Sequence, residues 1–312
     1  MIISQLTGGL GNQFFQYAMA RRLAHYHGVE LLVDVSNYSS GEEPRPQSLQ
    51  AFGRQLGLFR FQVKTREATL EEVERIRDPY WRSTPRDRAV RVVRRAWPSF
   101  LWRSSHIIEH QYRFQPEALL YPDNVYLQGY WQSEKYFADI APQIRRELRP
   151  LDASVTESAL SAVEALRKKH ASVVSLHVRR GDLAHAHEVL GQRQITYGAP
   201  VTMEYIEKSM REFSKDTCFF VFSDSPKDIE WCRENIRGDD LEFSNAESDM
   251  WDFAAMQQCD HHIIANSTFS WWAAWLDDKP QRRVIAPRAW SPPDSIAPIH
   301  PEDLLPKDWK TL

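Results

Sequence analysis

The chain has 312 residues, of which 42% are hydrophobic and 12% aromatic. A chain of this length and composition can bury a sizeable core, and its length predicts two domains of about 150 residues each. The net charge of −3 excludes a globally basic protein, so the overall charge does not favour nucleic-acid binding.

The three cysteines, Cys218, Cys232 and Cys259, are odd in number and lack the short paired spacings of a zinc site. We therefore expect buried free thiols in a reducing compartment. The N-terminal sequence MIISQL has no basic and apolar signal segments, and no apolar run approaches the roughly 18 residues that span a bilayer. These features predict a cytoplasmic protein.

The first predicted elements are a strand, a glycine turn, a helix and a second strand. Their expected ranges are 2–6 for the first strand, 12–26 for the helix and 31–35 for the second strand. Gly8, Gly9 and Gly11 make a turn that lets backbone N–H groups approach an anion. Asn12 and Gln13 follow, and their amides could bond sugar hydroxyls or phosphate. Plain turn chemistry is the alternative, because GGLGNQ lacks the dinucleotide spacing G-x-G-x-x-G.

The segment 65–113 is unusually basic and poorly patterned for a sheet. Between Arg82 and Arg103 it has seven arginines against one acid, Asp87. Apolar residues at helical spacing over 89–96 place the arginines on another face of a predicted helix. Such a helix could rest on the anionic inner face of a membrane. The alternative is a solvated face packed on a domain.

The second half of the chain alternates strands and helices, which predicts a parallel sheet with helices on both faces. A strand over 125–132 and a helix over 134–148 precede the predicted domain boundary at residue 150. Beyond it we expect strands at 173–178, 218–222, 241–243, 262–265 and 283–286, and helices at 202–213, 227–235, 250–259 and 268–276. The proline-rich tail from Pro287 is expected to wrap the surface.

The sequence VVSLHVRRGDL predicts a buried strand that ends in charged residues. Arg179 and Arg180 place two guanidiniums at the carboxyl end of this strand, where open α/β sheets bind ligands. Arginine offers planar bidentate donors with a permanent charge, which suits a phosphate or pyrophosphate. The alternative is that one arginine pairs with Asp182 and the other faces solvent.

Two further strand ends are polar. Asp224 follows one predicted strand and could accept paired hydrogen bonds from a guanine base. Asn266, Ser267 and Thr268 follow another, with Ser267 or Thr268 as a helix N-cap beside free helix N–H groups. Capping alone explains either motif, but their occurrence with Arg179 at neighbouring strand ends predicts a nucleotide pocket.

Four motifs occur in order along most of the chain: GGLGNQFFQYA, HVRRGD, SDS and ANSTFSWWAAWL. In these motifs and their spacing the chain resembles the bacterial and animal α-1,2-fucosyltransferases. The resemblance implies two Rossmann-like α/β domains facing a cleft (GT-B type). Residues 1–150 would form the acceptor-side domain and residues 151–312 the domain that binds GDP-fucose. The implied reaction is an inverting transfer of L-fucose from GDP-fucose to the 2-hydroxyl of a β-galactoside.

Within that reaction, we expect Arg179 to stabilise the charge that develops on the β-phosphate as GDP departs. His177 and Asp182 are candidate bases, although Asp182 could equally orient the arginines, and no carboxylate stands out as the base. A dissociative route with a weak base and Asn12 positioning the acceptor also fits. The residues expected to bind the donor are Gly9, Gly11, Asn12, His177, Arg179, Asp224, Asn266, Ser267, Thr268 and Ser270.

We expect no metal and no cofactor. The resemblance implies metal independence, and the sequence has no D-x-D motif. The acceptor is expected to be chosen by the segment 183–200, where His185, His187 and Tyr197 depart from the pattern of the family.

Two other classes of protein stay open. A non-catalytic nucleotide-sugar or glycan-binding protein would keep the same arginines and aromatic residues. A dinucleotide-dependent oxidoreductase would need an acid at the end of the second strand. Asp34 is in that place, but the glycine spacing of the preceding turn does not fit.

Overall fold

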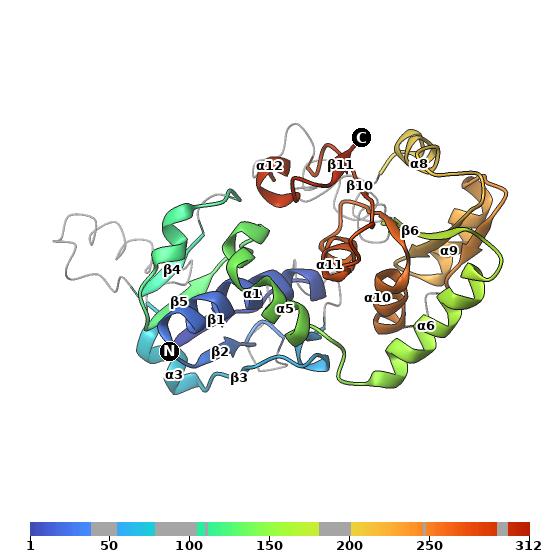
Figure 1. Cartoon of the computed structure of the whole chain (residues 1–312). Coiled ribbons are helices and arrows are strands. Elements are labelled where there is room, and N and C mark those ends of the chain that lie inside the picture. The colour runs from blue at the N-terminus through green and yellow to red at the C-terminus, as the bar shows by residue number, and fades with distance from the viewer. Residues whose placement is uncertain (39–54, 79–104, 110–111, 181–200, 246–247, 292–298) are drawn as a thin grey trace. The chain divides into compact units, whose positions relative to one another are not determined.

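The computed structural model describes residues 1–38, 55–78, 105–109, 112–180, 201–245, 248–291 and 299–312. The chain divides into two compact units (Figure 1). The N-terminal unit is Met1–Leu58 with Val63–Glu147, and the C-terminal unit is Phe59–Gln62 with Leu148–Leu312. The predicted boundary at residue 150 lies a few residues from this division. The predicted basic helix between Arg82 and Arg103 and the segment 181–200 lie outside the described residues.

The N-terminal unit is built on a five-stranded parallel sheet in the order β3-β2-β1-β5-β4. Its strands are β1 (Ile2–Gln5), β2 (Leu31–Asp34), β3 (Arg66–Glu67), β4 (His106–Ile108) and β5 (Val125–Gln128). Its α-helices are α1 (Leu10–His27), α3 (Leu70–Ile76) and α5 (Ala141–Glu147). The central strands β1 and β2 are buried along their whole length, as expected of a parallel sheet covered on both faces.

The C-terminal unit has a six-stranded parallel sheet in the order β11-β10-β9-β6-β7-β8. Its strands are β6 (Ser172–Val178), β7 (Thr217–Ser223), β8 (Leu241–Phe243), β9 (His261–Ile263), β10 (Val284–Ala286) and β11 (Lys310–Thr311). Its helices are α6 (Ala153–Arg167), α8 (Met203–Met210), α9 (Pro226–Asn235), α10 (Asp249–Gln258), α11 (Thr268–Leu276) and α12 (Pro301–Leu304).

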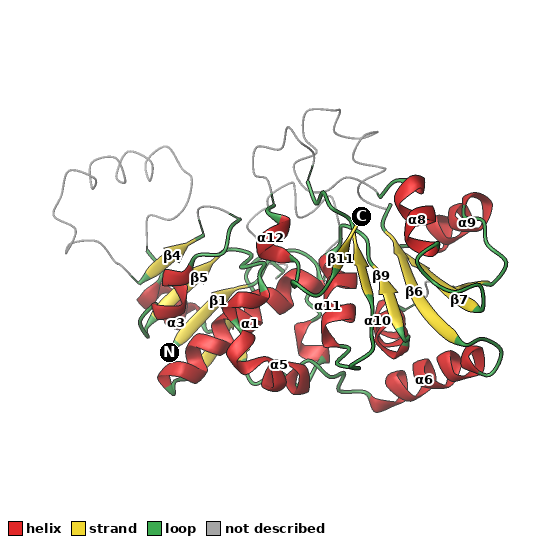
Figure 2. Cartoon of the chain, turned by 45° about the horizontal axis from the view of Figure 1, so that its top comes forward, coloured by secondary structure: helices red, strands yellow, loops and turns green. Residues whose placement is uncertain are grey.

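Helices cover both faces of this second sheet. Apolar side chains of α8 and α9 pack on one face, while α6, α10 and α11 lie along the other (Figure 2). Each unit, taken separately, is thus a parallel α/β domain, which confirms the predicted fold class of two Rossmann-like domains (GT-B type).

The predicted alternation of the second half is confirmed, and β8 and α11 have the predicted bounds. The interpretation of residues 65–113 as poorly suited to a sheet was wrong, because both β3 and β4 lie there. The helix predicted over 134–148 was also wrong. Short 3₁₀ turns, η4 (Glu134–Tyr136) and η5 (Ala138–Ile140), precede α5. Pro142 explains the break, because its ring would clash with the carbonyl of Ala138 in a continuous helix.

The C-terminal tail does more than wrap the surface. It contributes α12 and the edge strand β11, and Trp309 is buried with its ring 5.5 Å from that of Trp271. The indole N–H of Trp271 donates to the carbonyl of Leu304 at 3.0 Å. In the described parts of the chain, no helix has the length and apolar character needed to cross a membrane.

Candidate functional site

The carboxyl end of β6 carries the first group of predicted site residues. Successive side chains of a strand point to opposite faces of the sheet. In β6, Val174, Leu176 and Val178 pack against α8 and α9. Ser175, His177 and Arg179 form the other set, which contacts β9 and the start of α11. The strand therefore directs Arg179 toward the N-terminus of a helix.

Arg179 reaches the predicted N-cap of α11. Its Nη1 lies 3.5 Å from the Oγ of Ser267, which also accepts a hydrogen bond from the N–H of Phe269. Thr268 opens the helix, and the Ser270 hydroxyl donates to the carbonyl of Ser267 at 3.3 Å. A guanidinium beside a helix N-terminus combines a full charge with oriented N–H groups, which is an arrangement that binds anions.

Arg180 has a different environment from Arg179. Its guanidinium carbon lies 3.5 Å from the ring centroid of Trp231 on α9, which is a close cation–π contact. Its backbone N–H donates to Oδ2 of Asp224 at 3.1 Å. Asp224 is exposed and directly follows β7. The sequence did not indicate that Trp231 contacts Arg180. Asp182, a predicted site residue, lies outside the described residues.

His177 is buried, with 4% of its surface exposed. Burial, and then the charge of Arg179, lower the pKa of this imidazole to about 3. Its ring packs 6.1 Å from that of Phe269, and its Nδ1 has no hydrogen-bond partner among the described residues. A neutral imidazole of such low pKa is a poor proton acceptor, which argues against His177 as the base.

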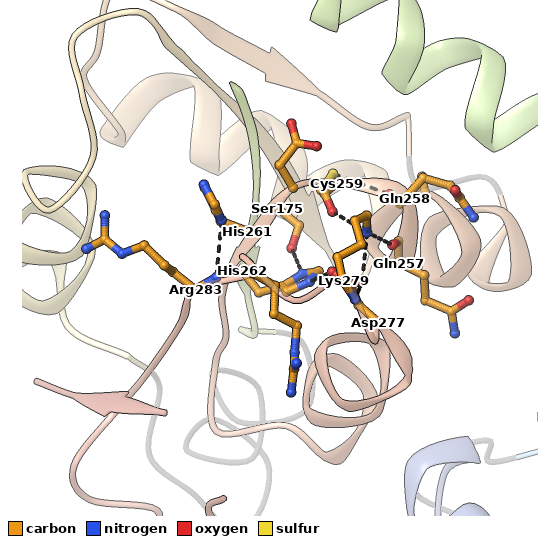
Figure 3. Close-up of polar contacts among 12 residues, drawn as sticks. Ser175, Gln257, Gln258, Cys259, His261, His262, Asp277, Lys279 and Arg283 are labelled. Carbon is orange, nitrogen blue, oxygen red and sulfur yellow. Dashed lines mark hydrogen bonds and ion pairs between the residues drawn. The ribbon is translucent and has the colours of Figure 1, made fainter. Parts of the chain in front are cut away.

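Deeper along the same face of β6 lies a polar network, the Ser175–His262–Asp277–Lys279 cluster, in which Lys279 is half-buried and the other three residues are buried (Figure 3). His262 Nε2 lies 2.9 Å from Asp277 Oδ2, and its Nδ1 lies 2.8 Å from the Ser175 hydroxyl. Lys279 Nζ lies 2.8 Å from the other Asp277 oxygen and donates to two carbonyl groups near the end of α10. Ser175 is only 3% exposed, so the cluster fastens β6, β9 and the end of α11 rather than offering a nucleophile.

In the N-terminal unit, the glycine turn after β1 holds the second group of predicted residues. Gly8 has a φ of 80°, and a Cβ there would lie 2.4 Å from Nδ2 of Asn12. Gly9 is the N-cap residue of α1 and provides no side-chain hydrogen bond there, and Gly11 is buried in the first turn of the helix. The turn therefore needs glycine at position 8 to admit Asn12.

The two amides after this turn differ in role. Asn12 Oδ1 accepts a hydrogen bond of 2.9 Å from Nε2 of Gln132, a residue that sequence reasoning missed. Gln13 is buried, donates to the carbonyls of Gly8 and Gln55, and accepts from two backbone N–H groups. Gln13 is therefore structural, and Asn12 is the amide left to consider for the acceptor.

Asp34, the acid that a dinucleotide-binding site would require, already forms hydrogen bonds within the N-terminal unit. Asp34 is buried, accepts a hydrogen bond of 2.6 Å from the Tyr126 hydroxyl and another from the backbone of Ser36. Arg77 lies 3.5 Å from the same carboxylate. The residue that an oxidoreductase would direct at a ribose therefore holds the fold together instead.

Comparison with known proteins places the chain in a family. Residues 1–311 match the sequence profile of glycosyl transferase family 11. The chain belongs to this family. Membership makes the protein an enzyme and sets aside the non-catalytic binding protein and the oxidoreductase.

Proteins of both bacterial and animal origin are similar to this chain. An α-1,2-colitosyltransferase of Escherichia coli is 29% identical over 99% of this chain and 98% of its own length. The O-antigen biosynthesis glycosyltransferase WbnK of Escherichia coli is 29% identical over 92% of this chain and 94% of its own length. The galactoside α-(1,2)-fucosyltransferase 2 of Bos taurus is 32% identical, but over 56% of this chain and 51% of its own length.

Proposed function

We propose that this enzyme is an inverting galactoside α-1,2-fucosyltransferase. It moves L-fucose from GDP-fucose to the 2-hydroxyl of a β-galactoside. The observation that carries the proposal is the approach of Arg179 to the N-cap of α11, in a chain of glycosyl transferase family 11. The relatives named as α-1,2-transferases support the linkage.

The C-terminal unit supplies the donor-side groups in this proposal. Departure of GDP leaves negative charge on a β-phosphate oxygen, and Arg179 with the N-terminus of α11 stabilises that charge more in the transition state than in the ground state. Asp224 accepts from the guanine base. The backbone contact from Arg180 fixes the position of this carboxylate.

The N-terminal unit supplies the acceptor-side groups. Asn12 positions the sugar hydroxyl, and its own side chain is oriented by Gln132. Because Asn12 is itself held in one orientation, it can hold the acceptor hydroxyl in the position from which its oxygen attacks the anomeric carbon.

A second donor is favoured by a specific observation. The relative that matches 99% of this chain is named as a colitosyltransferase. Colitose is fucose without its 3-hydroxyl, so the two reactions share every bond that forms or breaks. A site that hydrogen-bonds the 3-hydroxyl would discriminate strongly against colitose, whereas an apolar site would not.

The test is GDP release from GDP-fucose and GDP-colitose, each with and without a β-galactoside such as lactose. We expect acceptor-dependent release with GDP-fucose and a product in which the new linkage is at the galactose 2-hydroxyl, identified by NMR. Preference for GDP-colitose would replace the donor but keep the reaction. Absence of acceptor-dependent release from both donors would overturn the proposal.

Transfer is also expected to persist in excess EDTA without added Mg²⁺ or Mn²⁺. The guanidinium of Arg179 and the N–H groups of α11 provide the positive charge that a bound cation supplies in metal-dependent transferases. The measurement is the initial rate after chelation, with a Mg²⁺-dependent kinase assayed in parallel to show that chelation is complete. A rate that collapses in EDTA and returns with divalent metal would contradict this expectation.

A cytoplasmic location, with contact to the inner membrane surface through the segment Arg82–Arg103, is part of the same proposal and is supported by the sequence alone. Each basic residue near an anionic surface contributes about 1 kcal/mol. Membrane contact is measured by co-sedimentation of the protein with vesicles that contain phosphatidylglycerol, compared with neutral vesicles. Equal recovery with both vesicle types would contradict membrane contact.

A further inference from the structure

Glu109 lies at the carboxyl ends of the strands of the N-terminal sheet, the side on which open α/β sheets bind ligands. It directly follows β4, which pairs with β5 so that Ile108 lies opposite Gln128. Glu109 therefore stands beside Gly129, and a Cβ on that glycine would lie 2.5 Å from the Cβ of Glu109. The glycine leaves the space that the glutamate side chain occupies.

The carboxylate holds the turn that follows β5. Its Oε2 accepts hydrogen bonds from the backbone N–H groups of Tyr130 at 2.6 Å and Trp131 at 3.2 Å. Trp131 has a φ of 54°, an unusual conformation for a bulky residue that the surrounding structure must maintain. Within the described residues, the other oxygen, Oε1, makes no hydrogen bond.

The same turn carries the contacts of Asn12. Gln16 Nε2 donates to the carbonyl of Gly129 at 3.0 Å, and Gln132 donates to Asn12. Asn12 and Gln16 are four residues apart and so share one face of α1. The turn of residues 129–132 is thus held by Asn12 and Gln16 of α1 and also by Glu109.

Glu109 also has the chemical character of a base. It is partly buried, and this burial raises the pKa of its carboxyl to about 7 against the opposing effect of the two N–H groups. The titratable group that faces it among the described residues is Tyr121, whose pKa is raised by burial, then by Glu117 and Glu109. No cation among the described residues lowers the pKa of Glu109. A proton acceptor is most effective when its pKa lies near the working pH.

We propose that Glu109 is the catalytic base of the transfer, an inference that rests on the proposed function. Its Oε1 accepts the proton of the acceptor 2-hydroxyl as the oxygen of that hydroxyl forms a bond to the anomeric carbon of the donor sugar. The bond from that carbon to the β-phosphate oxygen breaks, and its electron pair leaves with GDP. Asn12 positions the hydroxyl, and Arg179 stabilises the departing charge.

The test begins with Glu109→Gln, which keeps the side-chain shape and an oxygen for the two backbone N–H groups. We expect kcat for transfer to fall about 10²- to 10⁴-fold. The wild-type rate should rise with pH through a midpoint near 7, because burial raises the pKa of the Glu109 carboxyl to about 7, and the variant should lose this pH dependence. Glu109→Asp, which retains a carboxylate, should recover part of the rate. Glu117→Gln, at an exposed neighbouring acid, is the matched control and should keep both the rate and the pH profile.

Azide separates a base from a structural support, because azide attacks without losing a proton. In Glu109→Ala, azide should restore GDP release and yield the fucosyl azide of inverted configuration. Transfer by Glu109→Gln within about threefold of wild type with an unchanged pH profile would overturn the proposal. Loss of GDP binding by every Glu109 variant, with no azide-dependent release, would overturn it as well and assign a structural role. Failure of the proposed function itself is distinguished by the wild-type enzyme, which would then transfer no sugar from GDP-fucose.

Discussion

Arg179→Lys is expected to lower kcat for transfer by about 10²- to 10³-fold without unfolding the protein, as is typical for removal of one preorganised donor to a developing oxyanion. Lysine keeps the positive charge but loses the planar fork that binds two phosphate oxygens at once. It also cannot reproduce the contact of the guanidinium with Ser267 at the N-cap of α11. Arg179→Ala, which removes the charge too, should lower the rate further.

Arg180→Lys is the matched control for this prediction. Arg180 neighbours Arg179 in sequence, but its guanidinium stacks on Trp231. The control should lower the free energy of unfolding by less than about 1 kcal/mol, because lysine keeps a cation near Trp231 but loses the planar stacking of the guanidinium, and transfer should change far less than in Arg179→Lys. Steady-state kinetics with GDP-fucose and lactose, alongside urea unfolding, measure both effects. Near wild-type turnover in both Arg179 variants would remove this residue from the mechanism.

The donor-side part of the candidate site was accessible from the sequence because its residues lie at the ends of clear elements. Arg179 directly follows a strand that apolar residues mark clearly, and Ser267 precedes a helix whose bounds the pattern gives correctly. The parallel order of the sheet then brings the two residues together. The strand and helix patterns, together with the rule that parallel strands end on the same side of a sheet, were sufficient to predict the donor-side residues.

The acceptor-side part could not be predicted in the same way. Glu109 follows a three-residue strand in a basic stretch, and its place beside Gly129 depends on the pairing of β4 with β5. The low pKa of His177 likewise depends on burial, to which Phe269 contributes from far along the chain. Gln132 has no sequence pattern that marks it, because its role comes from the conformation of the preceding turn. These features follow from long-range packing, which a single sequence does not display.

The second large effect is expected when the Ser175–His262–Asp277–Lys279 cluster is broken. Asp277→Ala should lower the free energy of unfolding by about 1–3 kcal/mol, because it leaves the N–H group of the buried His262 without its acceptor and removes the carboxylate beside Lys279. Urea unfolding followed by tryptophan fluorescence measures the loss. Glu204→Ala is the control, since it breaks an exposed pair with Lys208 and should lower the free energy of unfolding far less than Asp277→Ala. Equal losses in the two variants would show that the cluster contributes little.

The same cluster has a pH dependence whose sign follows from the protonation of His262. Burial lowers the pKa of this imidazole, against the opposing effect of Asp277. The neutral ring uses both nitrogens, since Nε2–H donates to Asp277 and Nδ1 accepts from the Ser175 hydroxyl. The unfolded chain binds a proton on His262 below pH about 6.5 and the folded chain does not, so this contribution to stability is lost as the pH falls below that value.

His262→Gln isolates this contribution. Glu109 and Asp252 have raised pKa values and therefore change stability in the opposite direction over part of the same range, but they titrate equally in both proteins. The stability advantage of the wild type over His262→Gln should accordingly shrink between pH 7.5 and pH 5. Asp277 does not produce this change, because its pKa is lowered from an already acidic value and its carboxylate stays ionised throughout. An advantage that stays constant or grows toward pH 5 would mean that His262 is protonated in the fold and forms an ion pair with Asp277.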